Sequence, residues 1–157
     1  MSKRDEIAKH DFQSGQRTAK KAAGILVAKR TGFVVPTARQ KQNLLVAFAK
    51  KGKVVYGKAF DIVKATGSVN LDDLASVEAN LHRVTVFEIK STKKNLRADF
   101  SKFFFGLTGA EVLVAQSLKH QFKFVLVNTT TRQHTEIDLA QIFARAKGIY
   151  PTWSISF

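Results

Sequence analysis

Glu88 and Lys90 are two residues whose types and spacing could do chemistry. They lie in the stretch VTVFEIKSTKK, residues 84–94, which begins with the β-branched and aromatic side chains that are typical of an interior strand. Alternate side chains of a strand point to opposite faces, so we expect Glu88 and Lys90 on one face and Phe87 and Ile89 on the other. An acid and a base would then stand side by side.

Asp61 is a second acid in an apolar stretch, AFDIV at 59–63. If its strand neighbours that of Glu88, the two carboxylates could share a cation. An Mg²⁺ ion held by two carboxylates can activate a water molecule and neutralise the charge that develops during phosphodiester hydrolysis. Asp61 and Glu88 would be ligands, the backbone carbonyl of Ile89 would be a third, and Lys90 would orient or deprotonate the water and offset phosphate charge. We expect Mn²⁺ to substitute for Mg²⁺.

A purely structural explanation of these residues is also open. Glu88 and Lys90 could form a solvated pair on an edge strand, which contributes about a few tenths of a kcal/mol to stability. Asp61 could be a turn or cap residue, because the Tyr56-Gly57-Lys58 segment could break its strand. The sequence alone leaves both explanations standing.

The charge balance indicates a polyanionic partner. The 157 residues include 26 Lys and Arg against 12 Asp and Glu, which gives a net charge of +14. An inert basic surface and an anionic membrane are alternatives, but no basic amphipathic helix with bulky apolar anchors stands out. Nucleic acid is therefore the expected partner.

Composition also limits the chemistry and the location. The chain has no cysteine, and its four histidines are scattered, so any metal must be held by oxygen atoms. No apolar run approaches the roughly 18 residues of a membrane span, and no hydrophobic segment follows the initial Met-Ser-Lys-Arg. We expect a cytoplasmic protein without a signal peptide.

Helical and extended patterns alternate along the chain, which predicts a single α/β domain over residues 1–157. Helices are expected at 14–32, 70–81, 108–121 and 138–148, the third from a capping box of Thr108 and Glu111. Strands are expected at 33–35, 54–66 (one strand or a pair), 84–90, 100–107, 122–128 and 153–157. Residues 38–53 fit either a helix or a hairpin, and 91–97 read as a basic loop.

Asp61 followed by Glu88-Ile89-Lys90 resembles the PD-(D/E)xK nuclease superfamily, which includes type II restriction enzymes and archaeal Holliday-junction resolvases. The resemblance covers roughly residues 14–128, including the element order and the segments FEIKSTKK, FFFGLTGAEVLVAQ and FKFVLVN. It implies a restriction-endonuclease-like central mixed β-sheet flanked by helices, with Asp61, Glu88 and Lys90 catalytic.

The sequence departs from the superfamily pattern in two places. Phe60, rather than proline, precedes Asp61. Many members add a glutamate from the first helix, whereas here that helix offers Gln16, with Glu6 and Asp11 before it. The identity of any further metal ligand stays open.

The leading hypothesis is an Mg²⁺-dependent endonuclease acting on double-stranded DNA, most simply a small type II restriction enzyme or its catalytic subunit. Cutting both strands would require a homodimer or a partner subunit. A Holliday-junction resolvase and a non-catalytic basic nucleic-acid-binding module are the alternatives. The residues expected to contact DNA are basic and flank the site: Arg17, Lys20, Lys21, Lys93, Lys94, Arg97 and Lys102.

Overall fold

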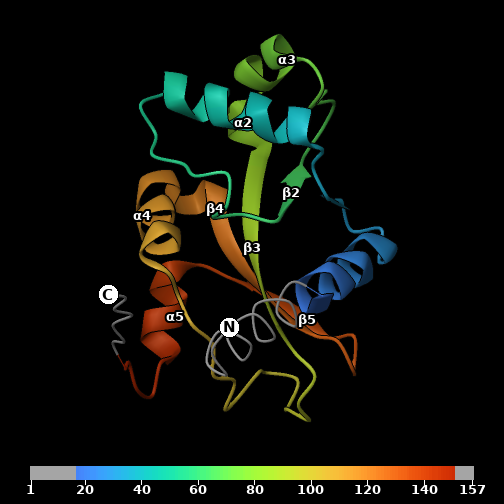
Figure 1. The fold of residues 1–157 in the computed structure, drawn as a ribbon, viewed down its shortest axis with the longest axis vertical. Helices are drawn as coiled ribbons and strands as arrows, with labels where there is room; N and C mark the ends of the chain where they lie inside the picture. Colours follow the sequence, from blue (N-terminus) through green and yellow to red (C-terminus); the bar gives the residue numbers. More distant parts are fainter. Residues whose placement is uncertain (1–16, 151–157) are drawn as a thin grey trace, which may run out of the picture.

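Five strands form one sheet in the order β1-β2-β3-β4-β5 (Figure 1). The structure is a computed structural model and describes residues 17–150. The strands are β1 (Phe33–Val34), β2 (Ile62–Ala65), β3 (Val84–Thr92), β4 (Phe122–Asn128) and β5 (His134–Ile137). β3 and β4 run parallel, and the other neighbouring pairs run antiparallel. The prediction of an α/β fold with a mixed sheet and flanking helices is confirmed.

β3 and β4 form the centre of the sheet because their apolar side chains can be buried on both faces. Every residue of β4 except Lys123 is buried. The register places Glu88 of β3 beside Phe124 of β4 and Lys90 beside Leu126. The alternative of a solvated edge pair is therefore wrong, since the charged pair lies on the central strand.

Helices cover both faces of the sheet. One face carries α2 (Ala38–Lys50), α3 (Leu74–Ala79), α4 (Gly109–Leu118) and α5 (Leu139–Arg145), which pack against Val84 and Val86 of β3 and their neighbours. The other face carries the N-terminal helix, residues 17–28, whose Ile25 and Leu26 pack with Phe87 and Ile89. Figure 1 shows the N-terminal helix, in blue, on the opposite side of β3 from α4 and α5.

Side-chain caps determine where the helices on the first face begin. Thr37 with Gln40, Thr108 with Glu111 and Asp138 with Gln141 form capping boxes at α2, α4 and α5, and Asp73 caps α3. The ambiguous segment 38–53 is thus a helix, followed by Gly52 at a φ of 68°. The predicted helix at 108–121 is confirmed in its N-terminal cap, although its α-helical part ends at Leu118.

One predicted strand is much shorter than expected, and another is absent. Within 54–66 the strand is Ile62–Ala65, because residues 57–58 form a turn and the chain is irregular up to Asp61. Residues 100–107 form no strand, since Phe100 and Lys102 have φ values of 58° and 65°, which a strand cannot contain. Phe100 is nevertheless buried in the core, whereas Phe104 is 79% exposed.

Several boundaries also differ from the predictions. β3 continues through Ser91 and Thr92, the N-terminal helix ends at residue 28, and α5 ends at Arg145. β5 was not predicted from the sequence. The first residues of the predicted helix, 14–16, and the predicted strand 153–157 lie outside the described residues. Across residues 17–150, no helix has the length and apolar character needed to cross a membrane.

Candidate active site

Glu88 and Lys90 project from β3 toward the face covered by α2 and α4. Val84 and Val86 occupy the same face in the core, and the alternation of β3 continues this face through Glu88 and Lys90. The Lys90 ammonium nitrogen lies 3.3 Å from Oε1 of Glu88. Their side chains are 12% and 13% exposed, so the pair is largely withdrawn from solvent.

Asp61 lies directly before β2, beside the middle of β3. Its backbone N–H donates to the carbonyl of Phe87 at 2.8 Å, and its Oδ2 accepts from the backbone N–H of Ile89 at 3.0 Å. The N–H and C=O of one strand residue point to the same edge, so the Ile89 carbonyl faces the side on which Asp61 lies. The structure thus brings Asp61 to the Glu88-Ile89-Lys90 segment.

Glu111 is a site residue that sequence reasoning missed. It is only 5% exposed, and its two carboxylate oxygens lie 2.9 and 2.8 Å from the Lys90 nitrogen. Its capping-box spacing to Thr108 was visible in the sequence, but a cap residue is ordinarily at the surface. The signal that could have found it was the order of elements, which brings the start of α4 back over the sheet.

Lys41 of α2 is the second site residue that was missed. Its ammonium nitrogen donates to the carbonyl of Phe60 at 2.7 Å and lies 4.6 Å from the centre of the Phe60 ring. Burial lowers the pKa of Lys41, while the charges of Asp61 and Glu88 act in the opposite direction. The acids therefore lie within the electrostatic reach of Lys41 as well as of Lys90.

Glu88 is the carboxyl group with the least favourable surroundings in the site. Its Oε2 is buried and has no hydrogen-bond partner among residues 17–150. Burial, followed by the charge of Asp61, raises the pKa of Glu88 to about 9, and the charge of Lys90 only partly opposes this shift. A cation bound at Oε2 would relieve both the missing contact and the repulsion between the acids.

The donors that could hold a divalent metal are the Asp61 carboxylate, the Glu88 carboxylate and the Ile89 carbonyl. All three are oxygen donors of the kind that Mg²⁺ prefers, and the unpartnered Oε2 of Glu88 fits such an ion. No set of three or more acidic or histidine side chains in the described part of the chain is placed to hold a metal. Gln16, together with Glu6 and Asp11, lies outside the described residues.

The basic loop after β3 is held at the end of β4. Side chains of Asn128 and Thr130 donate to the backbone carbonyls of Lys94 and Lys93 at 3.0 Å each. These contacts fix the start of the loop next to the end of β4. The predicted DNA-contacting residues of the loop, all exposed, are Lys93, Lys94, Arg97 and Lys102.

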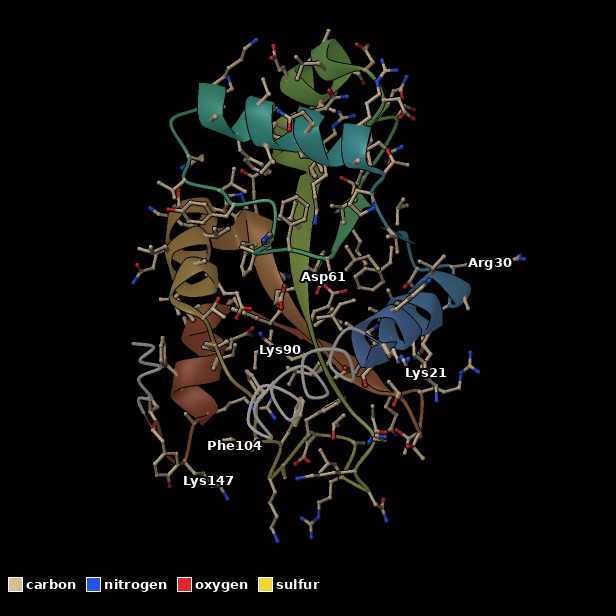
Figure 2. All side chains as sticks on the ribbon, viewed as in Figure 1. Lys21, Arg30, Asp61, Lys90, Phe104 and Lys147 are labelled. Atoms are coloured by element: carbon tan, nitrogen blue, oxygen red, sulfur yellow. The ribbon has the colours of Figure 1, made fainter. Side chains whose placement is uncertain are left out.

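The other predicted DNA-contacting residues are on the N-terminal helix. Arg17, Lys20 and Lys21 are exposed, and the helix packs on the face of the sheet opposite to Glu88 and Lys90. Figure 2 shows Asp61 and Lys90 near the middle of the fold and Lys21 on this helix to one side. The seven basic residues thus form two groups rather than one ring around the acids.

Comparison with protein-family models, with curated protein sequences and with solved structures found no match to this chain. The geometry of the acids and lysines is therefore the basis for any function.

Proposed function

We propose that this protein is an Mg²⁺-dependent endonuclease that hydrolyses phosphodiester bonds in double-stranded DNA. The observation that carries the proposal is the convergence of Asp61, Glu88 and Lys90, with the Asp61 carboxylate hydrogen-bonded to the backbone between the other two. Two acids and a lysine, largely withdrawn from water, form the set of groups that metal-assisted phosphodiester hydrolysis requires.

Each residue has a distinct role in this proposal. Asp61, Glu88 and the Ile89 carbonyl would hold Mg²⁺, which supplies a polarised water and neutralises charge on the phosphate oxygens. Lys90, as an ammonium group, would orient the attacking water and offset negative charge that develops on the phosphate. Low solvent exposure at Glu88 and Lys90 would strengthen these electrostatic effects.

The charge of the chain supports DNA as the substrate. A net charge of +14 favours binding to a polyanion, and the loop after β3 carries exposed basic side chains next to the catalytic strand. Phosphate contacts of this kind hold the duplex but do not read its sequence. Cleavage of both strands would require a second copy of the chain or a partner subunit, as in a small type II restriction enzyme.

A non-catalytic nucleic-acid-binding module is the second candidate. One observation favours it: Lys90 already contacts Glu88 and both oxygens of Glu111, an arrangement that would also suit a purely structural ion network. In this case the protein would bind DNA equally well in a chelator and would cut nothing with any divalent metal.

The test is a cleavage assay on supercoiled plasmid with Mg²⁺, with Mn²⁺ and with a chelator, using Asp61→Asn as the matched control. The proposal expects nicked and linear products from the wild type with either metal and none from the control. Discrete fragments from a long linear duplex would indicate a restriction enzyme, whereas cutting restricted to four-way junctions would indicate a junction resolvase. Absence of cutting with both metals would contradict the nuclease proposal.

A further inference from the structure

We infer that Glu111 is a positioning residue that fixes the catalytic lysine, an inference that rests on the proposed function. Lys90 lies 2.8 and 2.9 Å from the two oxygens of Glu111, but 3.3 Å from Oε1 of Glu88. The shorter contacts show that Glu111 is the stronger partner. Glu111 therefore holds the ammonium group more closely than Glu88 does, and Oε2 of Glu88, the oxygen that fits a metal, accepts no hydrogen bond from it.

The capping box of α4 holds Glu111 in place. The backbone N–H of Glu111 donates to Oγ1 of Thr108 at 3.2 Å, and the N–H of Thr108 donates to Oε2 of Glu111 at 3.1 Å. The capping box thus fixes the carboxylate at the first turn of the helix, independently of its contact with Lys90. A side chain fixed at both ends can orient a flexible lysine, whose free chain has many rotamers.

Glu111 is poorly placed to be a metal ligand itself. Both of its oxygens already contact Lys90, and Oε2 also accepts from Thr108. The acids in the described residues form no group of three that could hold a metal. A buried ion pair is also weak evidence of a stabilising role, because burying the charges offsets most of their attraction. Orientation of Lys90 is the role that these contacts leave for Glu111.

In catalysis, the two glutamates would have different roles, since Glu88 would bind the metal and Glu111 would orient Lys90. With Glu111 present, Glu88 would be free to hold the metal while Lys90 stays over the position of the water. Without the charge of Glu111, the ammonium group would move closer to Glu88 and compete with the metal for its carboxylate. Loss of Glu111 should therefore lower the turnover rate and raise the Mg²⁺ concentration needed for cleavage.

The test uses Glu111→Gln, because glutamine preserves the cap. This chain already uses glutamine at the same position of two capping boxes, Gln40 in α2 and Gln141 in α5. The cap of α4 should therefore survive in the variant, and any fall in its unfolding temperature would come from the lost charge rather than from a lost cap. The matched control is Thr108→Ser, which keeps both the cap and the charge of Glu111.

Two measurements examine the variant. The first is the ¹H–¹⁵N NMR signal of the Lys90 ammonium group in metal-free protein, assigned by its absence in Lys90→Arg. We expect a slowly exchanging signal in the wild type and in Thr108→Ser, and loss of that signal in Glu111→Gln. The second is plasmid cleavage, for which Glu111→Gln should lower kcat by about 10- to 100-fold, the usual effect of removing a supporting group, with little change in KM for DNA.

The outcomes separate this inference from the proposed function. An unchanged Lys90 signal in Glu111→Gln would overturn the inference even if the protein cuts DNA. Loss of the signal with an unchanged kcat would also overturn it, because the contact would then be structural only. Failure of the wild type to cut any DNA would overturn the proposed function, and this result appears in the wild-type assay, independently of the variant.

Discussion

The carboxylate of Asp61 accepts a hydrogen bond from the backbone N–H of Ile89 at 3.0 Å. This bond attaches the acid that precedes β2 to the residue between Glu88 and Lys90. Asp61 therefore has two roles, since one oxygen completes the hydrogen bonding of a buried backbone group and its charge raises the pKa of Glu88.

Replacement of Asp61 should separate these two roles. Both Asp61→Asn and Asp61→Ala should abolish cleavage, because neither provides a carboxylate. Asp61→Ala should also lower the free energy of unfolding by about 1–3 kcal/mol, because it leaves the N–H of Ile89 without an acceptor, whereas asparagine can still accept that bond. Urea denaturation and plasmid cleavage on both variants measure the effects. Near-wild-type cleavage by Asp61→Asn would show that Asp61 is not a metal ligand.

Removal of Lys90 should abolish cleavage and also destabilise the fold. Lys90→Met leaves the buried Glu111 without its cation, which should lower the free energy of unfolding by about 3–5 kcal/mol. The double variant Lys90→Met/Glu111→Gln should recover most of this loss but no activity. DNA binding by the double variant should persist, since the exposed basic residues are intact. Equal stability of the single and double variants would argue against an interaction between Lys90 and Glu111.

The ionisation of Glu88 should make the stability of the metal-free protein depend on pH. Burial and the charge of Asp61 raise its pKa from 4.5 to about 9, so the folded state binds the proton more tightly than the unfolded state does. The contribution of Glu88 to the free energy of unfolding is complete below pH 4.5, and it is lost as the pH rises through about 9. Glu88→Gln should therefore become more stable than the wild type as the pH rises from 5 to 9, as measured by urea denaturation in a chelator. Parallel pH profiles of the two proteins would contradict the shift.

Replacement of Lys93, Lys94 and Arg97 by alanine should weaken the binding of specific and of non-specific DNA duplexes by similar factors. Phosphate contacts release condensed counterions, so the slope of log K against log[salt] should decrease by about 0.9 per lost contact, or up to about 2.7 for three. Fluorescence anisotropy titrations over a range of salt concentrations measure this slope. An unchanged slope with an altered sequence preference would mean that these residues read bases.

Local signals in the sequence were sufficient for the elements that frame the site. The capping box of Thr108 and Glu111 and the apolar run FKFVLVN predicted α4 and β4, because the caps and the burial of these segments depend on nearby residues. The segment FSKFFF misled the prediction, since its phenylalanines resemble a strand while the positive φ angles of Phe100 and Lys102 depend on tertiary packing.

The candidate site was predictable in part. The alternation of β3 was enough to place Glu88 and Lys90 together, whereas Lys41 and Glu111 reach the site through the packing of α2 and α4 over the sheet. A lysine in a helix and a glutamate in a capping box are ordinarily solvated, so their sequence context gives no sign of burial. For Glu111 the order of elements was a hint, whereas Lys41 is identified only by the packing of α2 over the sheet.

The parallel pairing of β3 with β4 has a consequence for how quickly the protein folds. Val86 lies beside Phe122, so the chain must leave one end of β3 and return to the other end, through the basic loop and α4, before this pairing can form. Such distant pairing is slow compared with the closing of a hairpin. The contact between Lys90 and Glu111 spans the same crossover, so it forms only after this pairing. A partly folded or partly synthesised chain would therefore expose its basic segments before Lys90 and Glu111 are in contact. In the proposed nuclease, attraction to DNA would then precede the ability to cut it.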